Sequence, residues 1–347
     1  MSITHSYTKL LALLDEYHRL GIAEQIDYQK FYLYSLITHS TAIEGSTVTE
    51  IENQLLFDEG ISAKGRSIQE QMMNLDLKNA YERSMQMAGL HTDFSVDMLK
   101  GLSALVMKNT GSEYHTMQGT FDSSKGYLRL LGVTAGVGGS SYLNFQKVPA
   151  KLEEFCQQLN ERRKALLQSS DVIEKYLLSF NAHFQLVTIH PWVDGNGRMS
   201  RLVMNHLQYE FGLIPSKIIK EDKAEYIQAL IDAREQETLA PYREFMVEEH
   251  IRNLTREIEL FKKSQLADPI KPFSDPINSS SDPIKEKLYQ AIVKDNTLNY
   301  AAYAAMIGIS EATVKRRLGE LKKAGIITRV GSNKNGHWKI VGKEGEV

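Results

Sequence analysis

Apolar residues recur at helical spacing through most of the first 263 residues. Between residues 6 and 22, leucines gather on one helix face and acidic residues on the other. Between residues 28 and 44, Phe, Leu, Tyr and Ile repeat at the same spacing. Comparable patterns cover residues 66–89, 95–108 and 242–263. The sequence therefore predicts a mainly α-helical body.

The period of the pattern changes between residues 126 and 148. Residues 126–134 and 142–148 resemble strands, and a glycine- and serine-rich cluster at 136–141 separates them. This order predicts a β-hairpin. Since two strands alone are marginally stable, the hairpin is expected to lean on the helical body.

The C-terminal part is set apart by a spacer. Between residues 264 and 283, Asp-Pro-Ile recurs three times and four of the eight prolines occur, which predicts an extended, semi-rigid linker. Residues 284–341 then show three short helical patterns followed by two strand-like runs. That order predicts a small winged helix-turn-helix domain of α+β type, whose third helix would enter the major groove if the domain bound DNA.

One polar stretch interrupts the helical pattern with several chemically active side chains. An apolar helix pattern leads into it from residue 176, and Pro191 disfavours the helical conformation for the residue before it. The helix is therefore predicted to end at His190, with the imidazole at the mouth of a loop. The stretch reads His190-Pro191-Trp192-Val193-Asp194-Gly195-Asn196-Gly197-Arg198-Met199-Ser200-Arg201.

The second half of this stretch suits a polyphosphate. Gly195-Asn196-Gly197 can turn successive backbone N–H groups into one hollow at the start of the next helix. Arg198 and Arg201 lie three residues apart on one helix face, so both guanidinium groups can point toward that hollow. Asp194 supplies a hard oxygen ligand of the kind Mg²⁺ prefers.

These residues match the motif of the Fic family, H-P-F-x-D/E-G-N-G-R-x-x-R, with Trp192 in place of Phe. The resemblance covers about residues 30–260 and implies an all-helical Fic core with a β-hairpin flap. It implies a protein adenylyltransferase, which transfers AMP from ATP, with Mg²⁺, to a Ser, Thr or Tyr hydroxyl of an unidentified target protein. His190 would be the general base, Asp194 the metal ligand, and Gly195, Asn196, Gly197, Arg198 and Arg201 the nucleotide-binding residues.

A second match lies at the end of the 28–44 helix pattern. Glu44 is poorly placed against the dipole of a helix C-terminus, which suggests a cationic partner elsewhere. The segment resembles the inhibitory motif S/T-x-x-x-E-G/N of many Fic proteins, and by that resemblance Glu44 would pair with Arg201 and block the γ-phosphate. Just downstream, Thr47 with Glu50 predicts a capping box that starts another helix.

The resemblance adds two weaker assignments. Tyr226 lies where the family often has a tyrosine on the adenine side of the nucleotide, although a packed core tyrosine is the alternative. Val133 and Thr134 would belong to the flap that docks the target segment by strand addition. The predicted domains are an N-terminal helical region with the inhibitory helix (1–90), the catalytic core (91–263), the linker (264–283) and the winged domain (284–347).

Charge is distributed unevenly along the chain. The formal net charge is −2, but residues 284–347 hold 12 Lys and Arg against 6 Asp and Glu. A basic tail domain on an acidic body is compatible with DNA contact through residues 284–341. Winged helices also serve as protein-docking or dimer modules, so a homodimer remains an alternative.

Composition favours the cytoplasm. Cys156 is the single cysteine, which fits a reducing compartment, and the first residues lack the pattern of a signal peptide. No apolar run is long enough for a bilayer, so no membrane association is expected. Two other functions stay open: a Fic enzyme that transfers another phosphate-containing moiety or removes AMP, and a DNA-binding regulator whose Fic core only senses nucleotide.

Overall fold

The computed structural model describes residues 3–135, 141–266, 283–323, 326–330 and 337–340. These residues fall into two compact units. One unit runs to residue 262 without residues 24–28, and the other contains residues 24–28 with the described residues from 263 onward.

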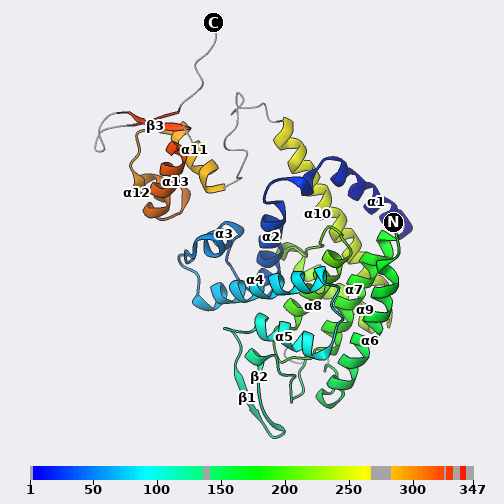
Figure 1. The fold of residues 1–347 in the computed structure, drawn as a ribbon. Coiled ribbons are helices and arrows are strands. Elements are labelled where there is room, and N and C mark those ends of the chain that lie inside the picture. Colours follow the sequence, from blue (N-terminus) through cyan, green and yellow to red (C-terminus); the bar gives the residue numbers. More distant parts are fainter. Residues whose placement is uncertain (1–2, 136–140, 267–282, 324–325, 331–336, 341–347) are drawn as a thin grey trace. The chain divides into compact units, whose positions relative to one another are not determined.

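The first unit is mainly helical, as predicted (Figure 1). Short 3-10 segments cover Ile22–Glu24, Ser123–Lys125, Phe145–Lys147 and Lys220–Asp222. Its helices are α1 (Ile3–Arg19), α2 (Tyr28–Ile43), α3 (Glu50–Glu59), α4 (Ile68–Gly89), α5 (Val96–Val106), α6 (Val148–Leu167), α7 (Val172–Ile189), α8 (Asn196–Glu210), α9 (Lys223–Glu235) and α10 (Ala240–Leu266).

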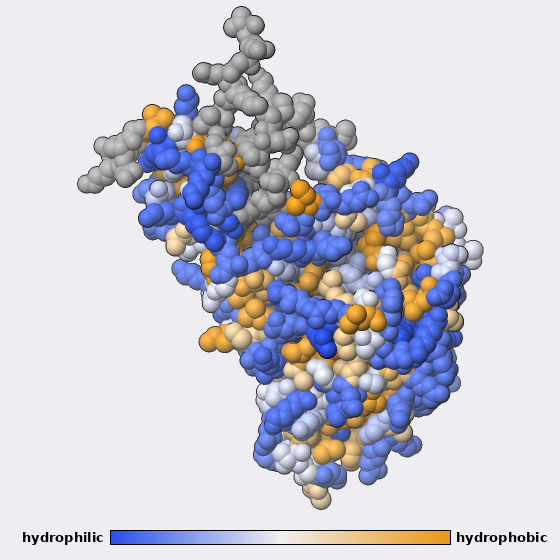
Figure 2. All heavy atoms as spheres, viewed as in Figure 1, coloured by the Kyte–Doolittle hydropathy of each residue, from blue (hydrophilic) through white to orange (hydrophobic). Residues whose placement is uncertain are grey.

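The core of this unit is built around α7 and α8, which pack side by side, with α4 against α8 and α6 against α7 (Figure 1). Helix α8 is buried on nearly all sides, as its apolar residues Met199, Leu202, Val203, Met204 and Leu207 require. The polar motif therefore continues directly into α8, a helix whose residues are mostly buried. Figure 2 shows that polar residues cover much of the visible face.

The β-hairpin of this unit lies at a different place from the predicted one. Strands β1 (Glu113–Thr116) and β2 (Gly119–Asp122) pair antiparallel, with Tyr114 opposite Phe121. The prediction of strands at 126–134 and 142–148 was wrong, since those described residues form one isolated bridge, between Thr134 and Ser141. The predicted turn falls partly on residues 136–140, outside the described residues.

A buried arginine explains why residues 126–134 are not a strand. The guanidinium of Arg129 donates from Nη1 to the carbonyl of Leu131 at 2.8 Å and from Nη2 to the carbonyl of Leu143. The backbone N–H of Arg129 donates to the carbonyl of Pro191 at 3.1 Å. Backbone groups that would form a ladder are therefore satisfied by a side chain and by the motif loop.

The second unit has the predicted winged helix-turn-helix arrangement. Its elements are α11 (Pro283–Lys294), α12 (Tyr300–Ile307), α13 (Glu311–Lys323), β3 (Ile327–Val330) and β4 (His337–Ile340). The two strands pair antiparallel. The three helices and the wing share one core, formed by Leu288, Ile292, Tyr303, Val314, Leu318 and Trp338. Of the predicted linker, residues 267–282 lie outside the described residues.

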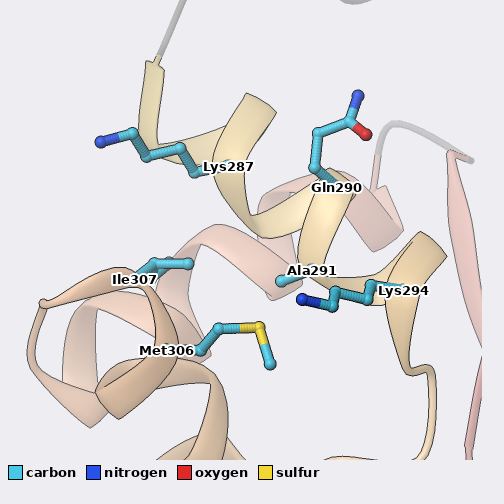
Figure 3. Close-up of a pocket in the computed structure, with 6 residues that line it drawn as sticks. All are labelled: Lys287, Gln290, Ala291, Lys294, Met306 and Ile307. Carbon is cyan, nitrogen blue, oxygen red and sulfur yellow. The ribbon is translucent and has the colours of Figure 1, made fainter.

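A shallow groove runs between α11 and α12 of this unit, with a volume of about 380 Å³ (Figure 3). Its apolar floor comes from Ala291, Met306 and Ile307, and two lysines, Lys287 and Lys294, stand at its rim. Helix α13 contributes none of the groove residues.

Among the described helices of the whole chain, none has the length and apolarity needed to cross a membrane.

Candidate active site

The candidate site is the loop between α7 and α8. Helix α7 ends at Ile189, and the N–H of His190 still donates to the carbonyl of Leu186 at 3.0 Å. His190 itself adopts the left-handed conformation, with φ 54° and ψ 62°. The chain leaves the helix at the predicted residue, and the imidazole stands at the loop mouth.

The loop is closed by a reciprocal pair of hydrogen bonds. The Asn196 amide accepts from the N–H of Trp192 at 3.0 Å and donates to the carbonyl of Trp192 at 2.8 Å. The fully buried Trp192 indole also donates to the carbonyl of Gly126 at 3.1 Å. The Asn196 side chain therefore shapes the loop, and any contact of Asn196 with nucleotide is left to its backbone N–H.

The environment of His190 favours a neutral imidazole. Nδ1 lies 3.3 Å from the carbonyl oxygen of Val187, which can only accept, so Nδ1 carries the proton and Nε2 keeps a lone pair. Burial lowers the pKa of His190 to about 4, and the positive charges of Arg129 and Arg234 also lower it. The hydrogen bond to the carbonyl of Val187 and the negative charge of Asp194 raise this pKa, but their effect is smaller. At neutral pH the ring is an acceptor through Nε2.

The start of α8 forms the predicted hollow. Gly195 has φ 79° and ends the loop, and the first N–H groups of a helix lack intrahelical acceptors. Gly197 allows close approach: a Cβ there would lie 2.5 Å from Glu44 Oε1 and 3.1 Å from Arg201 Nη1. A glycine-lined helix N-terminus with two arginines fits the phosphates of a nucleotide.

Arg201 is held by the last turn of α2. Its Nη2 donates to Glu44 Oε1 at 2.5 Å and to the carbonyl of Ser40 at 3.0 Å, and its Nε donates to Ser40 Oγ at 2.8 Å. Arg201 is 3% exposed, whereas the Glu44 side chain is 33% exposed. Burial raises the pKa of the Glu44 carboxyl, but the charge and hydrogen bond of Arg201 outweigh it, so the pKa lies below its ordinary value.

Arg198 and Asp194 form the other side of the hollow. Arg198 is buried, with Nη1 3.4 Å from the carbonyl of Val106 and Nη2 3.6 Å from Asp194 Oδ2. The Asp194 side chain is 60% exposed, and its Oδ1 accepts from the N–H of Gly195 at 2.5 Å. Within the described ranges no three His, Cys, Asp or Glu side chains gather as a metal cage. One exposed carboxylate beside a phosphate hollow nevertheless suits Mg²⁺, which keeps waters and takes substrate oxygens.

Of the weaker assignments, Tyr226 is buried next to Arg201. Its hydroxyl also lies 3.0 Å from Nε2 of the buried His183. Burial raises the pKa of Tyr226 to about 12, against the charge and hydrogen bond of Arg201, which lower it. Val133 accepts from the N–H of Tyr142 at 3.0 Å, and Thr134 forms the isolated bridge with Ser141.

Three residues around His190 were missed by sequence reasoning. Arg129 donates from Nε to the carbonyl of His190 at 2.8 Å. The ring of Tyr142 stacks on the His190 imidazole with centroids 3.8 Å apart, and Arg234 lies over Tyr142. Arg129 left one signal, a charge inside the apolar run 127–131. Tyr142 and Arg234 left none, since they reach His190 only through the tertiary fold.

Comparison with known proteins agrees with the motif. Residues 93–208 match the Fic/DOC family, and residues 281–328 match the winged helix-turn-helix DNA-binding family. Protein adenylyltransferase fic-1 of Caenorhabditis elegans is 26% identical over 204 residues, which cover 58% of this chain and 36% of that protein. Protein adenylyltransferase Fic of Drosophila mojavensis is 28% identical over 201 residues, covering 57% and 36%.

Solved structures share the fold. A Fic domain-containing signaling protein from Bacteroides thetaiotaomicron aligns with TM-score 0.58 and 20% identity over 76% of this chain and 97% of that chain. A Fic family protein from Desulfovibrio desulfuricans aligns with TM-score 0.57 and 18% identity over 99% and 97%. The chain spans little more than a third of the length of the curated relatives it matches. By motif, fold and sequence similarity, residues 93–208 form a Fic/DOC region and residues 281–328 a winged helix-turn-helix region, and the chain is distantly homologous to protein adenylyltransferases.

Proposed function

We propose that the chain is a protein adenylyltransferase that moves AMP from ATP to a Ser, Thr or Tyr hydroxyl of a target protein. The observation that carries the proposal is the state of His190, a neutral imidazole with Nε2 available beside a glycine-lined helix N-terminus. The names of the distant relatives, protein adenylyltransferases, support the same reaction.

The residues divide the reaction between them. Nε2 of His190 takes the proton of the target hydroxyl, and the hydroxyl oxygen forms a bond to the α-phosphorus. The bond between the α-phosphorus and the oxygen that bridges the α- and β-phosphates breaks, and pyrophosphate leaves with that oxygen. The backbone N–H groups at Gly195–Gly197, with Arg198, hold the phosphates and offset the developing charge.

Asp194 would hold Mg²⁺ against the phosphates of the nucleotide. The bound ion would neutralise phosphate charge and orient the leaving pyrophosphate. Arg201 would bind the γ-phosphate, which keeps the α-phosphorus next to His190. Val133 and Thr134 would present backbone groups to the target segment beside the site.

We also propose that Glu44 holds this enzyme in an inactive state. The carboxylate occupies the Arg201 fork at 2.5 Å, and Gly197 brings the same oxygen to the start of α8. A γ-phosphate cannot take the same donors while that pair persists. ATP would then bind with its triphosphate displaced, so the attacking oxygen would not meet the α-phosphorus in line.

The test follows label from ATP into protein. The Glu44→Gly chain, Mg²⁺ and a cell lysate are incubated with ATP labelled at either the α- or the γ-phosphate. Label from the α-phosphate alone is expected in protein, with a mass gain matching AMP. A His190→Asn variant is the control, because asparagine tolerates the left-handed conformation of residue 190 and lacks the base. Incorporation of the γ-label, or no incorporation from either, would reject adenylyl transfer.

A second function is proposed for the winged domain, which we infer binds DNA. Helix α13 carries the exposed Lys315, Arg316 and Lys322, and it is the third helix of a helix-turn-helix arrangement. Lysine and arginine contacts to phosphates release counterions, so affinity for duplex DNA should fall steeply between 50 and 200 mM salt, as is general for such proteins. Fluorescence anisotropy would compare Lys315→Glu with a control, Lys294→Glu, which removes an exposed lysine of α11. A loss of affinity in Lys315→Glu alone would place the contact on α13, and an equal loss in both would indicate unspecific attraction.

A further inference from the structure

Tyr142 and Arg234 form a stack over the His190 imidazole. The two rings lie nearly parallel, with an interplanar angle of 20° and centroids 3.8 Å apart. The guanidinium of Arg234 lies over the Tyr142 ring, 5.2 Å from its centroid. The three side chains come from three separate places in the chain, namely the segment before α6, the last turn of α9 and the end of α7. Neither Tyr142 nor Arg234 belongs to the motif.

The His190 ring needs such a support. The left-handed backbone at φ 54° is one that residues other than glycine rarely adopt, so neighbours must hold it. Arg129 holds the backbone through the carbonyl of His190 at 2.8 Å. Among the described residues, the hydrogen-bond contact of the ring edge is the long one from Nδ1 to the carbonyl of Val187, at 3.3 Å. A single long contact at Nδ1 does not fix the plane of the ring, so other side chains must fix it.

The stack supplies the missing constraint. Tyr142 covers a face of the imidazole, whereas Nε2 lies on the ring edge, outside the stacked face. Arg234 in turn ties the stack to α7, because its Nε lies 3.4 Å from Oγ1 of Thr188 in the last turn of that helix. A cation over an aromatic face is attracted by the ring's quadrupole, so the tyrosine is held between imidazole and guanidinium.

We propose that Tyr142, backed by Arg234, is a positioning residue that sets the plane of the His190 imidazole for proton abstraction. The inference rests on the proposed adenylyl transfer, in which His190 is the base. In this proposal, the aromatic face of Tyr142 orients the His190 ring, and the phenol hydroxyl of Tyr142 has no part in it. Phenylalanine at position 142 should therefore serve, and a small residue should not.

The charges around His190 agree with a ring kept neutral inside this stack. Arg129 and Arg234 face it from the 126–131 segment and from α9, and Asp194 faces it from the motif loop. Two cations against one carboxylate disfavour a third positive charge, and the tyrosine ring keeps water from one face. Removing the stack exposes the ring and weakens both effects.

The first experiment compares three variants in a Glu44→Gly background, where transfer is released. Tyr142→Ala should lower kcat about tenfold or more with KM for ATP within twofold, since misplacing a catalytic group costs rate rather than binding. Tyr142→Phe should stay within twofold of the parent. Tyr127→Ala, which removes an exposed tyrosine of the same segment, is the matched control and should change neither constant. Equal kcat for Tyr142→Ala and the parent, or an equal loss in Tyr142→Phe, would overturn the proposal.

The second experiment does not depend on transfer. The His190 ring is titrated by NMR, with its signal assigned against the His190→Asn variant. In the parent the pKa should lie near the value of about 4 that its burial produces. In Tyr142→Ala it should rise toward the ordinary value of 6.5, and in Tyr142→Phe it should not move. If the parent transfers no AMP, the proposed function fails while the titration still judges the stack; an unchanged pKa in Tyr142→Ala rejects the stack itself.

Discussion

Glu44 and Arg201 are the pair of residues on which the proposed regulation depends. Arg201 is almost fully buried, and its guanidinium donates hydrogen bonds to Ser40 in the last turn of α2 and to Glu44 directly after that helix. Separating a buried charge from its partner is costly, because the remaining charge stays desolvated. A phosphate that replaces Glu44 would restore the lost partner of Arg201, and this is the exchange that the proposed autoinhibition requires.

Glu44→Gly should raise the initial rate of AMP incorporation on the order of tenfold or more. A pair that keeps the competent state at a few per cent corresponds to about 2 kcal/mol, which its removal releases. Glu44→Asp should activate less, if the shorter side chain still reaches Arg201 partway. The rate is measured with labelled ATP at fixed Mg²⁺. Equal rates for the wild type and Glu44→Gly would leave Glu44 as an ordinary residue at a helix end.

The same carboxylate predicts a pH dependence of stability. The pKa of Glu44 is lowered in the folded protein, with burial opposing and Arg201 driving the shift. Its contribution to the free energy of unfolding is therefore fully present above the ordinary value of about 4.5 and is lost as pH falls through the lowered folded value. Urea denaturation of wild type and Glu44→Gln should give a constant difference from pH 7 to 5, and a smaller one toward pH 3. An undiminished difference at pH 3 would argue against the charged pair.

At the scale of elements, a buried polar network fixes the end of α2 that carries Glu44. Asn74 of α4 accepts from Thr41 Oγ1 at 2.8 Å and from Asn53 Nδ2 at 2.9 Å, and it donates to Ser46 Oγ at 3.1 Å. One amide thus joins α2, α3 and the segment between them. The position of Glu44 relative to α8 depends on this joint.

Asn74→Ala should lower the free energy of unfolding by about 2–4 kcal/mol, because it removes the three buried hydrogen bonds that Asn74 makes with Thr41, Asn53 and Ser46. The matched control is Gln69→Ala, an exposed amide on the same helix, which should change stability by less than about 0.5 kcal/mol. Chemical denaturation measures both. If the proposed autoinhibition holds, Asn74→Ala should also raise AMP transfer, since the end of α2 loosens.

Local chemistry explains which elements could be predicted. The end of α7 and the start of α8 followed from Pro191 and the glycines of the loop, which act on the backbone next to them. The predicted start of α3 was wrong by two residues, because Thr49 with Glu52 has the same spacing as Thr47 with Glu50. The structure uses Thr49 with Glu52 in place of Thr47 with Glu50, and Thr47 donates instead to Glu70.

Tertiary contacts explain what could not be predicted. Residues 126–134 have the pattern of a strand, but their carbonyl groups bond to the buried Arg129, whose role depends on the motif loop 61 residues away. The actual hairpin at 113–122 is short and polar, so its pattern was too weak to find. The stack on His190 joins residues 142, 190 and 234, and no spacing in the sequence relates them.

At the scale of the whole molecule, the two units each have a core of their own. In the second unit, the buried core residues come from α11, α12, α13 and the strands of the wing. Every contact described for the candidate site, from Glu44 and Arg129 to His190, Arg201 and Arg234, lies inside the first unit. The candidate site, as far as the structure describes it, is therefore built from residues of the first unit.

A chain that ends after Leu266, the last residue of α10, should fold by itself and transfer AMP. Its Glu44→Gly form should react within about twofold of the full-length Glu44→Gly protein, because no residue proposed for nucleotide or metal lies beyond Tyr226 of α9. It should also lose any affinity for DNA, since α13 is removed. Circular dichroism on heating, labelled AMP incorporation and DNA anisotropy measure the three properties on one preparation. A shortened chain that is folded but inactive would show that the winged domain takes part in catalysis, and an insoluble one would show that it stabilises the helical body; either result would reject separable units.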